Sequence, residues 1–274
     1  MKKRTSLIEF IVIVFLMIGN LSADLTKDGF NEATKGNFIK AKELWSKACA
    51  NDNMDGCSNL ASLYLNGDGV KKNKEKAIKL YIKVCDSGNF KVCNGLGLML
   101  RNSTTKTDNL KAIGYFRKAC DGGNKDGCFN LGFQYKNKDG MKTIKLYTKA
   151  CLAGHSQGCF NAGLMYYFGN SIRQNKKKAK EFYIKACDGG EMNGCFNIGT
   201  MYSNGDAVKK DKSKAEQFYI KSCNGGQVSG CFNLGFMYYN GDGIKKDKIK
   251  AKEFFGKACD GGNKNGCTNY KRIN

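Results

Sequence analysis

The chain of 274 residues contains no proline, one tryptophan and one histidine. Without proline to break them, helices must end at other signals, and the 34 glycines cluster in turns where helices are expected to stop. The single histidine, His155, leaves no set of imidazole ligands for zinc. We therefore expect no metal site and no cofactor, and we expect His155 on the surface.

Long apolar runs are also missing, apart from residues 10–18 near the N-terminus. This run is too short to span a bilayer comfortably, so no stable membrane span is expected. It follows basic residues at 2–4 and precedes the small residue Ala23, as in a secretory signal peptide. We expect a signal peptide over 1–23 and a secreted or periplasmic protein, with an uncleaved N-terminal anchor as the alternative.

Acidic residues are scarce, with 24 Asp and Glu against 46 Lys and Arg, for a net charge of +22. Such a charge favours acidic partners. The lysines, however, stand in loops and at helix starts, as in Lys71-Lys72 and Lys209-Lys210, without interleaved stacking aromatics. No nucleic acid is therefore expected as a partner. An anionic lipid or acidic polymer stays open beside a plainly solvated surface.

Cysteine, in contrast, is abundant and regular. All 14 cysteines fall into pairs whose members are eight residues apart, and successive pairs begin 31 to 36 residues apart. The pairs are Cys49 and Cys57, Cys85 and Cys93, Cys120 and Cys128, Cys151 and Cys159, Cys187 and Cys195, Cys223 and Cys231, and Cys259 and Cys267. This period predicts an all-α solenoid of αα-hairpins. We expect one repeat domain over 24–274, with about seven units.

The pairing is expected to be local. Asp211 can cap a helix that ends at Cys223, glycines at 225–226 stop it, and a second helix begins near Gly230. A cysteine ending one helix then lies beside a cysteine in the first turn of the next, which suits a disulfide. Each bridge would close a short loop, with a chain-entropy contribution of roughly 2.5 kcal/mol.

Several phrases of the chain resemble a known repeat. They are CFNLG at 231–235, YYNGDGI at 238–244, KA at 250–251 and FGKAC at 255–259. These residues resemble the SEL-one-like repeat, a relative of the tetratricopeptide repeat. With a cysteine pair in every unit, the chain is similar to the Helicobacter cysteine-rich protein family. The resemblance implies a right-handed superhelix of αα-hairpins with one disulfide per repeat.

The resemblance also implies penicillin binding and weak β-lactamase activity. A serine β-lactamase needs a Ser-x-x-Lys element together with Ser-Asp-Asn-type and Lys-Thr-Gly elements. The chain has one Ser-x-x-Lys, at Ser103 and Lys106, and no Lys-Thr-Gly. Ser103 and Lys106 are thus weak catalytic candidates, and a slow β-lactam hydrolase is an alternative that only the resemblance supports.

Two columns of residues predict a binding groove. Counted from the second cysteine of a unit, they hold asparagine at offset 2 and methionine at offset 6: Asn59, Asn130, Asn161, Asn197, Asn233, Met165, Met201 and Met237. The residues at offsets 0, 3, 4 and 7 form the packing seam, the helix face that packs into the hairpin. At 100° per residue, offsets 2 and 6 point away from this seam, so we expect them on the concave side. Asparagine can bond a peptide main chain, and methionine adapts to varied side chains.

The groove predicts a monomer that binds peptides or proteins, such as host factors, with peptidoglycan fragments or β-lactams as further partners. In the alternative interpretation, the asparagines brace neighbouring groups within the stack. The aromatic residues at offset 1 are expected between repeats: Phe129, Phe160, Phe196 and Phe232.

Two units depart from the period. The unit between Cys128 and Cys151 is about five residues short in its connecting segment, 136–140. In the unit between Cys93 and Cys120, residues 102–106 replace the glycine-containing turn. We expect the repeat geometry to lose regularity at both places.

Overall fold

The computed structural model describes residues 22–101 and 105–273, which form helices and turns without a strand. The predicted signal peptide over 1–23 lies almost wholly outside these residues, and the described chain opens with a helix over 22–34. None of the helices in the described ranges has the length and hydropathy needed to cross a membrane. The chain divides into two compact units, 1–122 and 123–274.

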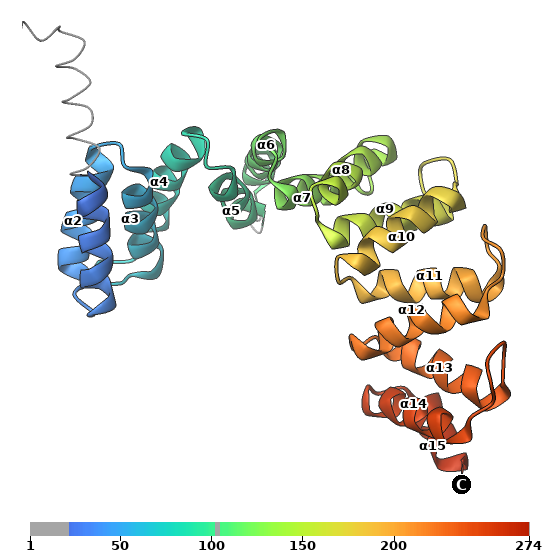
Figure 1. The fold of residues 1–274 in the computed structure, drawn as a ribbon. Helices are drawn as coiled ribbons and strands as arrows, with labels where there is room; N and C mark the ends of the chain where they lie inside the picture. Colours follow the sequence, from blue (N-terminus) through green and yellow to red (C-terminus); the bar gives the residue numbers. More distant parts are fainter. Residues whose placement is uncertain (1–21, 102–104, 274) are drawn as a thin grey trace, which may run out of the picture. The chain divides into compact units, whose positions relative to one another are not determined.

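Within each unit, each helix after the one over 22–34 packs against the helix that follows it. The first unit contains, after the helix over 22–34, α2 (Phe38–Ala50), α3 (Met54–Asn66), α4 (Lys74–Asp86), α5 (Phe90–Arg101) and α6 (Lys106–Asp121). The second unit contains α7 (Lys125–Tyr135), α8 (Gly140–Leu152), α9 (Ser156–Phe168), α10 (Lys176–Asp188), α11 (Met192–Asn204), α12 (Lys212–Asn224), α13 (Val228–Asn240), α14 (Lys248–Asp260) and α15 (Lys264–Arg272). Figure 1 shows the second unit as successive helices stacked from α7 to α15. The predicted all-α hairpin solenoid is therefore confirmed, whereas a single domain over 24–274 stays a prediction.

The helix boundaries follow local capping signals. Asp211 accepts a hydrogen bond from the Lys214 amide at the start of α12, and Gly225 follows its last residue, as predicted. The next helix begins at Val228, two residues before the expected start, because the Gln227 side chain caps it by accepting from the Ser229 amide. Only residues 225–227 therefore separate the two helices of this hairpin.

Each repeat is closed by its own disulfide. Six of the bridges join cysteines eight residues apart with Cα atoms 4.5–4.8 Å from each other. Cys120 and Cys128 are disulfide-bonded as well, and no described cysteine is free. The predicted one disulfide per repeat is confirmed.

The helices of a hairpin approach closely because small residues precede the cysteines. A Cβ atom placed on Gly194, before Cys195, would lie 2.7 Å from the Cβ of Ala186, before Cys187. The same glycine-on-alanine contact recurs at Gly56, Gly158 and Gly266. A larger side chain at these glycines would force the two helices, and therefore the two sulfur atoms, apart.

Adjacent repeats interlock through a buried aromatic ring. Four residues before its first cysteine, a repeat carries a ring that lies on a glycine of the preceding repeat, as Tyr183 does on Gly163. The equivalent pairs are Phe116 on Gly97, Tyr147 on Gly132, Tyr219 on Gly199 and Phe255 on Gly235. The rings at offset 1 join the same contact, with Phe160 and Tyr183 centroids 6.1 Å apart. The predicted position of these phenylalanines between repeats is confirmed.

Filling this glycine socket should weaken the stack. A Cβ on Gly163 would lie 2.6 Å from the ring of buried Tyr183, so Gly163→Ala is expected to lower the free energy of unfolding by about 1–3 kcal/mol. Gly114, on the exposed side of α6, has nothing within 4 Å of a Cβ atom. As the matched control, Gly114→Ala should raise the free energy of unfolding by about 0.5–1 kcal/mol. Urea denaturation of the oxidised proteins measures the free energy of unfolding of both variants. Equal changes in the two variants would contradict the claim that the Tyr183 ring leaves no room for a Cβ atom on Gly163.

Candidate functional site

The predicted methionine column is buried in part, which corrects the sequence-based expectation. Met201 is 1% exposed and Met237 4% exposed, and both belong to the apolar core. Offset 6 lies only about 60° from the seam residue at offset 3. Because a solenoid helix packs against helices on two sides, its buried arc is wider than one seam and includes this position. Met165 is half-buried and keeps an open side.

The asparagine column is mostly half-buried. Asn130 is only 9% exposed and is therefore not on an open surface, which corrects its expected place in the groove. Asn59, Asn161, Asn197 and Asn233 remain partly accessible. Burial raises the pKa of Tyr183, and the nearby Asn197 side chain acts in the opposite direction. Asn197 therefore lies near a tyrosine of its own repeat, while its partial exposure leaves the binding prediction open.

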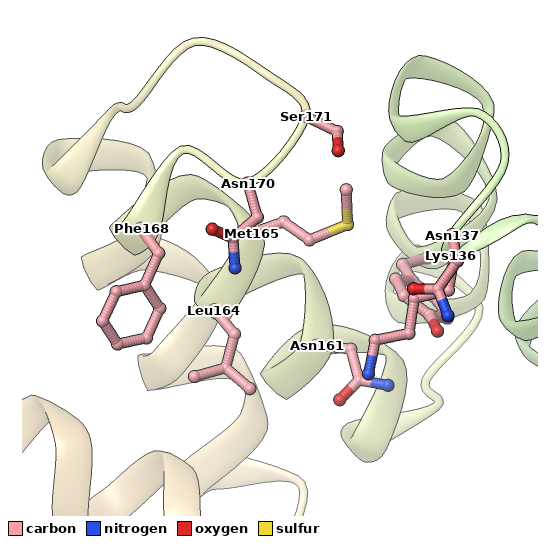
Figure 2. A pocket seen from close by; sticks show the side chains of 9 residues that line it. Lys136, Asn137, Asn161, Leu164, Met165, Phe168, Asn170 and Ser171 are labelled. Atoms are coloured by element: carbon pink, nitrogen blue, oxygen red, sulfur yellow. The ribbon is translucent and has the colours of Figure 1, made fainter.

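One hollow of about 510 Å³ opens beside the shortened repeat of the second unit. Figure 2 shows Lys136 and Asn137, from the segment after α7, facing the α9 side chains of Asn161, Leu164 and Met165. The rest of its lining comes from Tyr147, Phe168, Asn170 and Ser171. Phe168 is 59% exposed, so an aromatic surface borders the polar groups.

The shortening explains the position of this hollow. α7 has 11 residues and is joined to α8 by residues 136–139, whereas α9 has 13 residues and is joined to α10 by residues 169–175. Two residues are therefore missing from the helix and three from the connection, which accounts for the deficit of five. The connection after α9 is therefore longer than the connection after α7. Its residues Asn170 and Ser171 line the hollow beside the shorter connection.

The hydroxyl of Tyr147 is an unusual feature of the lining. It is buried and has no hydrogen-bond partner of acceptable geometry among the described residues. The Asn161 amide is near enough to lower the Tyr147 pKa against the larger effect of burial, which raises it. The equivalent hydroxyl of Tyr219 donates to Thr200 Oγ1 at 3.1 Å. Thr200 is five residues after Cys195, and the residue five after Cys128 in the repeat before Tyr147 is Phe133. Phenylalanine has no hydroxyl, so Tyr147 lacks this partner.

A second hollow of about 360 Å³ lies two repeats further along the chain. It is lined by the matching residues Tyr219, Asn233 and Met237, and by Phe236, which is 47% exposed. Its lysine, Lys212, forms an ion pair with Asp242, and both residues line the hollow. This hollow therefore carries a neutralised cation, unlike the first.

Of the two weak catalytic candidates, the structure describes only Lys106. Ser103 lies outside the described residues. Lys106 is exposed as the first residue of α6. Lys106 lines neither of the two hollows.

His155 is half-buried rather than on the open surface, which corrects its predicted position. Its Nδ1 atom accepts a hydrogen bond of 3.0 Å from the Gly158 amide and so caps α9. Its ring stacks on Phe129 with centroids 4.3 Å apart, and Nε2 lies 3.6 Å from Asp126 Oδ1. Burial lowers the His155 pKa, while Asp126 acts to raise it and Lys125 to lower it. The sequence carried a signal for this role, since other hairpins have asparagine at the same place.

The Sel1 repeat model matches the chain over residues 21–53, 55–89, 91–124, 126–155, 156–191, 193–227 and 228–263. A protective antigen of uropathogenic Escherichia coli with an SLR fold aligns at 22% identity and a TM-score of 0.78, covering 92% of this chain and 56% of that one. A Sel1 repeat protein from Oxalobacter formigenes aligns at 21% identity and a TM-score of 0.76, covering 99% of this chain and 83% of that one. These two likenesses show the fold.

The Helicobacter pylori cysteine rich protein B is 38% identical over 48% of this chain and 94% of its own, with a TM-score of 0.40. No curated protein matches the chain in sequence. The chain spans little more than half of the E. coli antigen's length. The family match, together with a disulfide in each repeat, confirms the resemblance found from sequence.

The missing partner of Tyr147 can be tested by removing its hydroxyl. Because that hydroxyl is buried without a hydrogen bond, Tyr147→Phe should leave the free energy of unfolding unchanged or raise it by up to about 1 kcal/mol. Tyr219→Phe, which removes the bond to Thr200, should lower it by about 1 kcal/mol. Thermal and urea denaturation measure both, and an equal loss in the two variants would show that Tyr147 has a partner.

The cap at His155 makes stability depend on pH. Since its pKa is lowered in the folded state, the folded protein binds fewer protons, and the contribution of His155 is complete above about pH 6.5 and declines as pH falls below it. Protonating Nδ1 removes the cap, worth about 0.5–2 kcal/mol. His155→Asn should therefore lose less stability than the wild type between pH 7.5 and 5. Parallel urea titrations of the two proteins check this, and identical pH profiles would contradict it.

Proposed function

Since the chain belongs to the Sel1 repeat family, we propose that it binds an extended peptide segment of a partner protein on the face of the second unit that carries the two hollows. Stacked repeats of this kind present extended surfaces to protein partners. The hollows occupy equivalent positions two repeats apart, and each is lined by an offset-2 asparagine that is partly accessible, Asn161 in the first and Asn233 in the second. One peptide strand can then meet the same chemistry twice.

One observation carries this proposal: an exposed phenylalanine and a partly accessible asparagine line each hollow. Phe168 and Asn161 line the first hollow, and Phe236 and Asn233 line the second. An accessible aromatic ring supplies apolar contact area, and the asparagine amide of the same hollow supplies a donor and an acceptor for a peptide main chain. Aromatic anchors of this type dominate the energetics of protein interfaces.

We also propose that the protein acts outside the cytoplasm, secreted or in the periplasm. The disulfide-bonded state of every described cysteine supports this compartment, because paired cysteines persist in oxidising spaces. Partners there include host proteins and peptidoglycan fragments. A β-lactam hydrolase receives no support from the described residues, because Lys106, the described candidate of the one Ser-x-x-Lys element, lines neither hollow.

Peptide binding can be separated from folding with a double variant. Asn233→Ala combined with Phe236→Ala should weaken binding of a peptide selected from a random library by about 1–3 kcal/mol, because a main-chain bond and an aromatic contact are lost. Asn265→Ala, an exposed asparagine outside both hollows, is the control and should bind like the wild type. Isothermal titration calorimetry measures affinity, and the thermal midpoint measures folding.

Two results would count against this function. A double variant that loses stability in proportion to affinity would identify Asn233 and Phe236 as internal braces. A library that yields no peptide with micromolar affinity for the oxidised wild-type protein would remove the proposal.

A further inference from the structure

The first hollow presents hydrogen-bond donors without a carboxylate. Its polar lining consists of a lysine ammonium, asparagine amides, a serine hydroxyl and the Tyr147 hydroxyl, and no Asp or Glu among the described residues lines it. The second hollow differs, because Asp242 lines it and pairs with Lys212. Of these two hollows, only the first thus offers a lysine that is not paired with a described carboxylate.

Lys136 provides this charge from a fixed place. It directly follows α7, and the short connection to α8 holds its backbone through a bond from its amide to the Phe133 carbonyl. Figure 2 shows its side chain extending toward Asn161. No carboxylate of the described residues forms an ion pair with Lys136.

The Tyr147 hydroxyl is the second donor. It is buried, it lines the hollow, and it has no partner within the described residues. A buried hydroxyl without a partner costs stability, so folding into this state favours a ligand that supplies an acceptor. The equivalent tyrosine of the second hollow already bonds Thr200 and has no such vacancy.

We propose that this hollow binds the free α-carboxylate at the C-terminus of a peptide, with Lys136 and Tyr147 contacting its two oxygens. This inference rests on the proposed peptide-binding function and specifies which end of the peptide is recognised. A carboxylate matches one cation and one neutral donor, whereas a phosphate dianion favours several cations or a bidentate arginine. Leu164 and Met165 line the same hollow and provide the apolar contact for the last side chain.

The size and field of the hollow fit this occupant. Its volume of about 510 Å³ falls within the range of about 300–1,000 Å³ that is usual for sites of small ligands. The net charge of +22 raises the local concentration of anions around the protein. Asn161 joins the hollow to the rest of the binding face, so a terminal residue there leaves the preceding residues free to extend along the repeats.

A small probe tests the hollow independently of any longer peptide. N-acetyl-L-leucine and N-acetyl-L-leucinamide are titrated into the oxidised protein and followed by NMR. The acid should shift the side-chain amide signals of Asn137 and Asn161, and the amide should bind about tenfold more weakly or not at all, because the charge is missing. Equal binding of the two probes, or shifts confined to the second hollow, would overturn the carboxylate site.

Matched variants identify the two donors. Lys136→Met and Tyr147→Phe should each weaken the acid by about tenfold, whereas Lys138→Met, in the same connection but outside the hollow, and Tyr219→Phe should stay within about twofold of the wild type. Retained or raised stability in Tyr147→Phe would show that its lost affinity is not a folding defect. An equal loss in Lys136→Met and Lys138→Met would indicate diffuse attraction and overturn the assignment.

Peptides separate this inference from the function on which it rests. Two synthetic hexapeptide libraries, one with free C-termini and one amidated, are screened against the same protein. Preference for free C-termini supports the inference. Equal binding of both libraries, with sensitivity to the Asn233 and Phe236 double variant retained, would overturn the inference and leave the function. Binding of N-acetyl-L-leucine without binding of either library would overturn the peptide function and its C-terminal recognition.

Discussion

The close contact between the two helices of a hairpin is the constraint on which the rest of each unit depends. Gly194 lies on Ala186 just before the two cysteines, so the backbones approach until the sulfur atoms can join. In the hairpin of α4 and α5 the corresponding residues are Val84 and Val92, and the Cα atoms of the cysteines are 4.8 Å apart instead of 4.5–4.6 Å. In the fixed hairpin, the buried aromatic ring four residues before the first cysteine packs on the glycine of the preceding repeat. This contact stacks one repeat on the next.

Much of this could be predicted from the sequence, because the determinants are local. The Cys223 and Cys231 bridge, the Asp211 cap and the glycine stop after α12 all follow from residues within one hairpin. Met201 and Asn130 were misplaced because helical periodicity identifies one seam, while a helix in a repeat stack is covered from two sides. His155 is half-buried because its ring stacks on Phe129 of the preceding repeat, a contact that the residues around it in sequence do not reveal.

The first hollow needs information from three repeats at once. The five-residue deficit near residues 136–140 is visible in the sequence, but its effect depends on the full-length connection that follows α9. The unpaired state of Tyr147 depends on Phe133 occupying the place that Thr200 holds elsewhere. The sequence does contain this signal: the residue five positions after the second cysteine is Thr200 in the repeat before Tyr219 and Phe133 in the repeat before Tyr147. The geometry that joins Lys136, Tyr147 and Asn161 required the structure.

The disulfides of this chain also bear on how it acquires its covalent form. Every bridge with described geometry spans eight positions and stays inside one repeat. Because the entropy lost on closing a loop grows with its length, each thiol meets its native counterpart far more often than any other in the unfolded chain. Oxidation can then proceed unit by unit, in any order, as soon as a hairpin is available. Scrambled isomers are disfavoured by proximity, so a chain with 14 cysteines has little need of a disulfide isomerase.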